Sequence, residues 1–321
     1  MKSRILLLDA GNSGVKAAVC TMRRNRFGLI QHGAPRKVRR VETASVTEEW
    51  LKECALTLCL NSGTGSENAS RLTTVPVAFS SVVPRVTELI RQVFPGKQSW
   101  QVKATEDLGW QLNYPDRANL GGDRICSAAA ARALRADLGG NIVAIDFGTA
   151  TTFNVVNAKG AFIGGVIAPG FNMMLSYLHE KTALLPKLEP APHKRTIGRN
   201  TREAMQAAVV PGYIGMIRQL IFSIFQELQD SAKAKHFEEQ RNQSATTSAV
   251  PEFAVLHCNG TNPPGLEGEL PAVPFSLIAT GGHAKLLAKQ LPEISEFRPY
   301  LNLEGLAIMA AHAMNRGKLG A

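Results

Sequence analysis

The order of apolar and polar residues over 141–154 predicts a strand, a tight turn and a second strand. The apolar run 142–145 is short and bounded by turn residues, which is typical of a strand buried on both faces. Asp146 ends this run, and the apolar signal returns at Phe153. Considered alone, the stretch is an ordinary hairpin with a polar turn.

The turn of this hairpin carries groups that suit a phosphate and a cation. Gly148 lets the backbone approach a ligand closely. The hydroxyls of Thr149, Thr151 and Thr152, together with turn N–H groups, can bind phosphate oxygens. The carboxylate of Asp146 can hold a cation.

A second copy of the pattern lies near the N-terminus, over residues 6–19. There an apolar strand ends in Asp9, and Gly11 and Ser13 precede the return of apolar residues. The repeat predicts equivalent hairpins in two similar α/β domains. Two acidic turns can then face each other across a cleft, which is a usual place for a ligand.

Elsewhere the pattern predicts an alternation of strands and helices. Strands are expected at 75–80, 100–102, 253–257 and 275–279, and helices at 47–60, 84–94, 127–138, 171–179, from 201 onward, 213–228, 283–290 and 303–315. Residues 164–170 read as a glycine-rich loop. The polar composition of residues 229–274 indicates a surface insertion, which need not be ordered throughout.

Length and composition are those of a globular protein with room for two domains, at 321 residues and 45% hydrophobic. The chain contains no run of eighteen apolar residues, so we expect no transmembrane helix. Its N-terminus enters a strand directly, so no signal peptide is expected. The five cysteines are irregularly spaced and predict buried, reduced thiols in a cytosolic protein.

The net charge of +10 is concentrated between Arg23 and Arg40. Such a run can meet nucleic acid. Here it is interleaved with Phe27, Leu29 and Val41, as on exposed strand faces, and no nucleic-acid-binding motif accompanies it. We therefore expect a solvated hairpin face and no nucleic-acid partner. A general attraction of anionic substrates is a further alternative.

A third acidic turn lies between the two hairpins. Gly121 and Gly122 precede Asp123 and Arg124, at the start of an alanine-rich helix. An acid at a helix N-terminus can be a simple cap. The glycine pair and the arginine favour a site instead, because Arg124 can grip a carboxylate in bidentate fashion. Asp123 can then act as a base toward a hydroxyl.

The segment Thr280-Gly281-Gly282 joins a predicted strand to a helix. Backbone N–H groups at such a turn can hold a phosphate or a nucleotide. An ordinary strand-to-helix turn is an equal alternative.

The carboxylates of Asp9, Asp123 and Asp146, with glycine and hydroxyl turns, suit phosphoryl transfer with a divalent metal. The chain has no G-x-x-x-x-G-K-[ST] segment, which excludes a P-loop kinase. It has neither the H-R-D nor the D-F-G motif of protein kinases, and no G-x-S-x-G elbow.

The duplicated D-x-G hairpins resemble those of the actin, hexokinase and heat-shock chaperone ATPase superfamily. Within it the chain resembles the type III pantothenate kinases, a family that includes the Bvg accessory factors. The matching motifs are Asp9 to Ser13 with Lys16, Ser80 to Pro84, Leu120 to Arg124, Asp146 to Thr152, Gly164 to Gly170, Thr182 to Pro186, Gly198 to Thr201, and Thr280 to Gly282. Each is weak alone, but their order spans nearly the whole chain.

The resemblance implies an α/β fold of two similar ribonuclease H-like (actin-like ATPase) domains around a cleft, residues 1–118 and 119–321. It implies ATP-dependent phosphorylation of the primary hydroxyl of pantothenate to 4'-phosphopantothenate, the first step of coenzyme A biosynthesis. The expected cofactors are ATP with Mg²⁺ or another divalent cation, and K⁺ or NH₄⁺. The expected protein is a cytoplasmic homodimer with its sites at the interface and no membrane partner.

The resemblance also implies roles for single residues. Asp123 would be the general base, and Arg124 would bind the pantothenate carboxylate. The expected pantothenate site further includes Tyr114, Gly121, Gly122 and, from the partner subunit, Thr201. The expected nucleotide and phosphate site comprises Asp9, Gly11, Asn12, Ser13, Lys16, Thr149, Thr152, Thr280, Gly281 and Gly282. Asp146 would hold the monovalent cation, and Asp9 the divalent one, directly or through water.

The chain departs from the family pattern at two short motifs. Ser13 stands where the family usually has threonine, and it keeps the hydroxyl. Pro115 lies farther from Leu120 than the family proline does. Two alternative functions remain: another small-molecule kinase such as a sugar kinase, and a regulatory protein that binds nucleotide without chemistry. The carboxylate grip of Arg124 argues against a neutral sugar.

Overall fold

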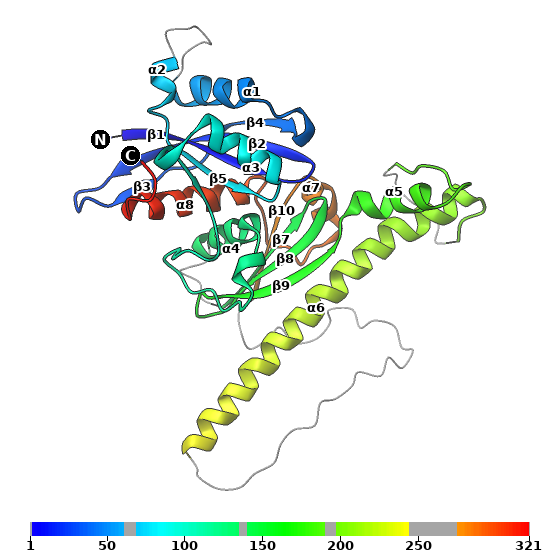
Figure 1. Cartoon of the computed structure of the whole chain (residues 1–321). Helices are drawn as coiled ribbons and strands as arrows, with labels where there is room; N and C mark the ends of the chain where they lie inside the picture. Colours follow the sequence, from blue (N-terminus) through cyan, green and yellow to red (C-terminus); the bar gives the residue numbers. More distant parts are fainter. Residues whose placement is uncertain (1, 61–68, 135–139, 190–196, 244–274, 321) are drawn as a thin grey trace.

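The protein folds into two β-sheets separated by helices (Figure 1). The computed structural model describes residues 2–60, 69–134, 140–189, 197–243 and 275–320. The predicted strand at 253–257, most of the polar loop after residue 60 and Cys258 lie outside these residues.

The first sheet is built on the N-terminal hairpin. Strands β1 and β2 pair antiparallel, with Asp9 opposite Lys16, and β5 and β6 follow in parallel on the far side of β1. The order is β3-β2-β1-β5-β6, and β4 also pairs with β2. The strands are β1 (Lys2–Ala10), β2 (Gly14–Arg24), β3 (Ile30–His32), β4 (Arg36–Glu42), β5 (Val77–Ser81) and β6 (Ser99–Gln101).

The second sheet repeats the five-strand order of the first, without a counterpart of β4. β7 and β8 form the antiparallel hairpin, β9 extends it, and β10 and β11 continue in parallel beyond β7. The strands are β7 (Asn141–Phe147), β8 (Ala150–Val156), β9 (Phe162–Pro169), β10 (Phe275–Thr280) and β11 (Glu296–Phe297). The repeated topology confirms the predicted pair of similar α/β halves. The boundary after residue 118 stays a prediction.

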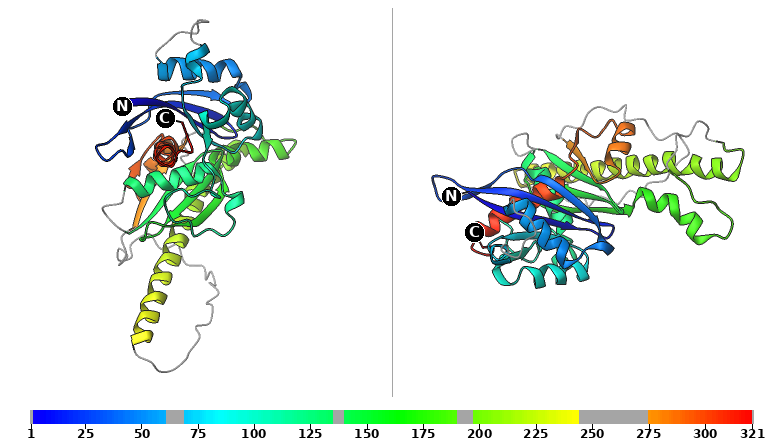
Figure 2. Two further views of the ribbon diagram at one scale, coloured as in Figure 1. Left: turned by 60° about the vertical axis from the view of Figure 1, so that its left-hand side comes forward. Right: turned by 90° about the horizontal axis from the view of Figure 1, so that it is seen from above.

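The helices form three layers around the sheets (Figures 1 and 2). Helices α1 and α3 cover the outer face of the first sheet, α4 and α8 lie between the sheets, and α5, α6 and α7 pack on the outer face of the second. The helices are α1 (Glu48–Cys54), α2 (Ala69–Leu72), α3 (Pro84–Val93), α4 (Gly122–Leu134), α5 (Phe171–Lys181), α6 (Thr201–Gln243), α7 (Ala284–Leu287) and α8 (Leu301–Asn315).

The apolar runs of both hairpins are buried on both faces, as predicted. Ile5 and Leu7 face the helices between the sheets, and Leu6 and Leu8 face α1 and α3. Each fully buried aliphatic side chain contributes roughly 1.5–3 kcal/mol. A shift of the strand by one residue would exchange the two sets. This burial therefore fixes the register of β1 and with it the position of Asp9 near the end of the strand.

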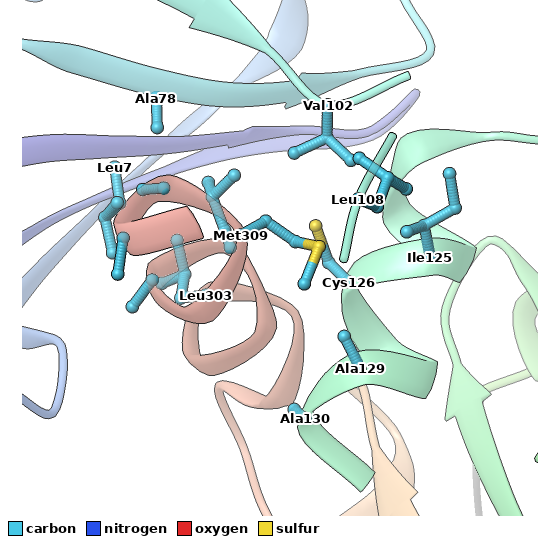
Figure 3. Close-up of a cluster of buried hydrophobic side chains, with 14 of the residues drawn as sticks. Leu7, Ala78, Val102, Leu108, Ile125, Cys126, Ala129, Ala130, Leu303 and Met309 are labelled. Carbon is cyan, nitrogen blue, oxygen red and sulfur yellow. The ribbon is translucent and has the colours of Figure 1, made fainter. Parts of the chain in front are cut away.

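Helix α8 ties the two halves together through one continuous core. Figure 3 shows Leu7 of the first sheet against Leu303 and Met309 of α8, with Cys126 of α4 beside them. A Cβ atom on Gly305 would overlap the carbonyl oxygen of Cys126, so the close contact of α8 with α4 requires glycine there. The C-terminal helix thus positions both α4 and the ends of the central strands.

Several predicted elements are wrong in kind or extent. Residues 164–170 are mostly strand rather than loop, because β9 pairs with β8 and its glycines let the backbones approach. The two helices expected after residue 201 are one helix, which continues through Pro211. This helix also takes in residues 229–243, which the composition had assigned to the insertion. Finally, α4 begins at Gly122, five positions before the expected residue 127.

The expectations for the cysteines and for the basic run agree with the described residues. Cys20, Cys54, Cys59 and Cys126 are buried free thiols. The arginines of the basic run are mostly exposed on β2 and β4, together with Phe27 and Leu29. The run is thus a solvated face.

One helical stretch among the described residues, Thr201–Ser231, is long and apolar enough to cross a membrane. The sequence had predicted no such helix. Length and composition do not by themselves make a membrane span, because a core helix can have both. Only 33% of its most apolar window is buried in this chain.

Candidate active site

Three acidic turns converge where the two halves meet. Asp9 and Asp146 occupy equivalent positions, near the ends of the first hairpin strand of each sheet. Asp123 lies in the first turn of α4, between the sheets. The negative charges of Asp9 and Asp146 both raise the pKa of Asp123, which reports their proximity. The three carboxylates are therefore neighbours in space, where the sequence pattern predicts a ligand site.

Asp9 is buried beside one cation. Its carboxylate is 6% exposed, and its Oδ2 lies 3.7 Å from Nζ of Lys16 on the neighbouring strand. Burial raises the pKa of Asp9, and the charge of Lys16 opposes that rise. The pair leaves Asp9 available to a further cation, because Lys16 is at the long limit of an ion pair.

Asp146 faces the turn that follows β10. Thr280 is its direct partner across the parallel pair β7–β10. Gly281 has a φ of +99°, and a Cβ atom there would press on the Asp146 carboxylate and on the backbone of Phe147. Burial raises the pKa of Asp146. Gly281 and Thr280 thus lie at the cleft rather than in a remote turn.

The carboxylate of Asp123 has the environment of a base. Its Oδ1 accepts a hydrogen bond of 2.8 Å from the backbone N–H of Arg124. Burial, and next the charge of Asp9, raise the pKa of Asp123 to about 6. A Cβ atom on Gly122 would lie 2.9 Å from the carbonyl oxygen of Val102, so this turn requires glycine. A carboxylate with such a pKa can accept a proton near neutral pH.

Arg124 is a buried cation with donor capacity to spare. Its Nε donates to Oδ1 of Asn154 over 2.8 Å, and its guanidinium lies 6.0 Å and 5.7 Å from the ring centroids of Tyr114 and Phe162. Its Nη2 is buried and has no hydrogen-bond partner within the described part of the chain. A buried, unpaired donor of this kind suits a carboxylate ligand.

The turns of the two hairpins touch each other. Oγ of Ser13 lies 2.7 Å from Oγ1 of Thr149, and both residues are exposed, as is Asn12. Thr152, opposite Asp146 in the hairpin, accepts from Nδ2 of Asn154 over 3.3 Å. The hydroxyls expected to contact phosphates therefore lie on one side of the cleft.

Thr201 is the expected site residue that the chain does not bring to the cleft. It is exposed, at the start of α6, where this helix projects from the body beside α5 (Figure 1). Lys16, Thr152, Gly281 and Arg124 each adjoin one of the three carboxylates. Gly121 precedes Asp123 and has no room for a Cβ beside its carboxylate.

Sequence reasoning missed three residues of the site. Asn154 orients Arg124, Phe162 lies beneath the guanidinium, and Asn302 donates to Asp146 over 3.0 Å. Asn154 was within reach of sequence reasoning, because it follows Thr152 on the same face of β8. Phe162 and Asn302 are distant in sequence and carry no local signal.

The acids fit cations that arrive with a nucleotide better than a preformed metal centre. Within the ranges described, no three His, Cys, Asp or Glu side chains form a group able to hold a metal ion. Magnesium in kinases needs only one or two carboxylates, because phosphate oxygens and water complete its ligands. Asp9 and Asp146 meet that need, and the buried Oδ1 of Asn302, which has no partner within those ranges, is a further oxygen donor.

Comparisons with known proteins agree on one family. A family model described as type III pantothenate kinase matches residues 5–222. A type III pantothenate kinase of Methylacidiphilum infernorum is 31% identical over 312 residues, which cover 97% of this chain and 90% of the relative. One of Thermomicrobium roseum is 30% identical over 307 residues, covering 94% and 95%.

The fold has a counterpart among solved structures. A Campylobacter jejuni protein described as a Baf family transcriptional activator superposes with a TM-score of 0.50 at 13% identity. The match covers 97% of this chain and 100% of that one. At this identity the likeness concerns the fold.

Proposed function

The chain belongs to the type III pantothenate kinase family, and we propose that the cleft of Asp9, Asp123 and Asp146 is its active site. The family's reaction is the ATP-dependent phosphorylation of pantothenate in coenzyme A biosynthesis, with a divalent cation. The observation that carries the assignment is the position of Asp123 and Arg124, which adjoin the two phosphate-type hairpins.

Asp123 is proposed as the general base. It takes the proton of the pantothenate primary hydroxyl as the oxygen attacks the γ-phosphorus of ATP. Its raised pKa of about 6 supports this role, because a base of that pKa is ionised at neutral pH and still accepts a proton. The transferred phosphoryl group leaves ADP, and the proton passes from Asp123 to solvent after transfer.

Arg124 is proposed to hold the carboxylate of pantothenate. The support is its buried Nη2, which lacks a partner, and the hydrogen bond to Asn154, which fixes the plane of the guanidinium. Tyr114 and the glycines before Asp123 line the same space. Pantothenate would then lie with its carboxylate at Arg124 and its hydroxyl toward Asp123.

The nucleotide is proposed to lie along the two hairpin turns. Asn12, Ser13, Lys16 and the threonines 149 and 152 would face the phosphates, and the Thr280 to Gly282 turn would add backbone N–H groups. A divalent cation at Asp9 would neutralise phosphate charge. Asp146 is proposed to hold the monovalent cation, K⁺ or NH₄⁺.

A cytoplasmic homodimer with Thr201 of one subunit at the pantothenate site of the other is the proposed assembly. Its support is the exposure of large apolar side chains on β9 and in the segments before α6. Ile167 is 63% exposed, Leu184 92% and Ile197 84%. A contact with a second subunit would cover such side chains.

The test is a coupled assay with purified protein, ATP, MgCl₂ and KCl, in which 4'-phosphopantothenate is identified by mass spectrometry. Pantothenate should be phosphorylated, and glucose, mannose and glycerol should not. Turnover of a sugar in place of pantothenate would redirect the assignment to another small-molecule kinase. Replacement of KCl by NaCl should reduce the rate if Asp146 holds a selective monovalent site.

A further inference from the structure

Asn302 occupies an unusual place in the core. It lies in the first turn of α8, between Leu301 and Leu303, which are fully buried, and is itself only 6% exposed. An amide in such surroundings needs partners for its donors and its acceptor. The partners of Asn302 should therefore explain why this buried position holds a polar residue.

Asn302 adjoins the equivalent carboxylates of both halves of the molecule. Its Nδ2 donates to Oδ2 of Asp146 over 3.0 Å. Burial raises the pKa of Asp9, and the amide of Asn302 opposes that rise, so these two side chains are also neighbours. A side-chain amide carries two N–H donors, so one group can face both acids.

The acceptor of Asn302 is left over. Its Oδ1 is buried without a hydrogen-bond partner in the described part of the chain. A buried orphan oxygen is unfavourable, and a purely structural contact would not need it. Amide oxygens are ligands for hard cations, so a cation held by Asp9 or Asp146 could supply the missing partner.

We propose that Asn302 is a positioning residue of the phosphoryl-transfer site, whose amide fixes the carboxylate of Asp146 beside that of Asp9 for cation binding. The inference rests on the proposed function of these carboxylates. Asn302 does not touch the transferred phosphoryl group in this scheme.

Two variants of Asn302 and one matched control test this role. Asn302→Ala removes the donors and the oxygen. Asn302→Asp keeps the shape but replaces the donors by a third carboxylate, and it serves if the alanine variant does not fold. Asn315→Ala is the control, because Asn315 lies at the other end of α8 and also joins the halves, through two hydrogen bonds to the backbone of Ile30.

The measurements separate positioning from folding. We expect Asn302→Ala to lower kcat by about 10- to 100-fold, as for outer partners of metal ligands, with a smaller change in the KM for pantothenate. The rise in melting temperature on addition of MgCl₂ and KCl, without nucleotide or pantothenate, should shrink in both Asn302 variants. Asn315→Ala should lower the melting temperature but keep the kcat and the response to both salts.

The inference is overturned if Asn302→Ala keeps the wild-type kcat and the wild-type response to the salts. It is also overturned if Asn315→Ala and Asn302→Ala lower the melting temperature equally and also lower kcat equally. If the wild-type protein shows no turnover, only the proposed function is refuted. The inference can still be tested, because the rise in melting temperature on addition of the salts can be compared between Asn302→Ala and wild type. A wild type with neither turnover nor salt response refutes both.

Discussion

The hydroxyl of Ser13 lies 2.7 Å from the hydroxyl of Thr149, although 136 residues separate them in the chain. The contact joins the turns of two hairpins that belong to different sheets. It places the hydroxyl groups of both turns where one chain of phosphates could touch them. Under the proposed function, residues from both halves of the molecule would therefore contact the phosphates.

Loss of the Ser13 hydroxyl should weaken nucleotide binding. We expect Ser13→Ala to raise the KM for ATP by about 2- to 10-fold, because a hydrogen bond contributes about 0.5–1.5 kcal/mol. Ser13→Thr keeps the hydroxyl and should stay close to wild type. The measurement is initial rate against ATP concentration at saturating pantothenate. An unchanged KM in Ser13→Ala would remove this turn from the nucleotide site.

Replacement of Asp123 should trade activity for stability. Asp123→Asn should lower kcat by about 10²- to 10⁴-fold, as expected on loss of a general base. It should also raise the melting temperature at pH 7–8, because burial and the charge of Asp9 disfavour the ionised form in the folded protein. A pKa raised from 3.8 to about 6 corresponds to at most about 3 kcal/mol.

The sign follows from linkage. The folded protein binds the Asp123 proton more tightly than the unfolded chain, so stability falls as pH rises from about 4 to about 6. The exposed Asp116 provides the control, and Asp116→Asn should leave both kcat and melting temperature near wild type. Full activity in Asp123→Asn would exclude Asp123 as the base.

The pH profile of kcat/KM for pantothenate should show the same group. The reactive form of Asp123 is the carboxylate, which is lost as pH falls through about 6. The rate should fall about tenfold per unit below that value, since kcat/KM reports the free enzyme. Circular dichroism at each pH controls for unfolding. A profile that stays flat down to pH 5 would contradict the raised pKa.

Arg124 should determine the preference for pantothenate over an analogue that lacks the carboxylate. Arg124→Met should raise the KM for pantothenate by about 10-fold or more, because a charge-assisted contact is lost. The KM for the alcohol analogue, which has a hydroxymethyl group instead of the carboxylate, should change less. Arg132→Met, on the same helix and over the ring of Trp110, is the control. Equal losses on both substrates would place the carboxylate elsewhere.

Subunit mixing should reveal a shared site. Asp123→Asn and Thr201→Arg homodimers should each be inactive, and their equimolar mixture after refolding should recover about a quarter of wild-type activity. Half of the dimers in the mixture contain one subunit of each variant. In such a dimer one of the two sites has both Asp123 and Thr201, and the other site has neither. No recovery, with mixed dimers demonstrated by mass spectrometry, would remove Thr201 of the partner from the site.

Local patterns in the chain were enough to predict the two hairpins and their acids. A strand buried on both faces requires an unbroken apolar run, and the residue that ends the run is visible without knowledge of its neighbours. The start of the helix expected at 47–60 was also right, because Thr47 caps α1 and accepts a hydrogen bond from the N–H of Trp50. The repeat then indicated two similar halves.

Longer elements were less accessible. The glycines of β9 resembled a loop because glycine is rare in isolated strands, yet pairing with β8 holds them in the sheet. Two helices were expected, from residue 201 onward and over 213–228, but α6 is continuous through Pro211. In both places tertiary contacts outweighed local preference.

The repeated hairpins, the three acidic turns and the resemblance to the family could all be recognised in the sequence. The folded chain was needed to show that Asp9, Asp123 and Asp146 are neighbours, that Asn154 orients Arg124, and that Asn302 donates to Asp146. A buried strand is recognised from its own residues, whereas a hydrogen bond between distant segments depends on how helices such as α8 pack between the sheets.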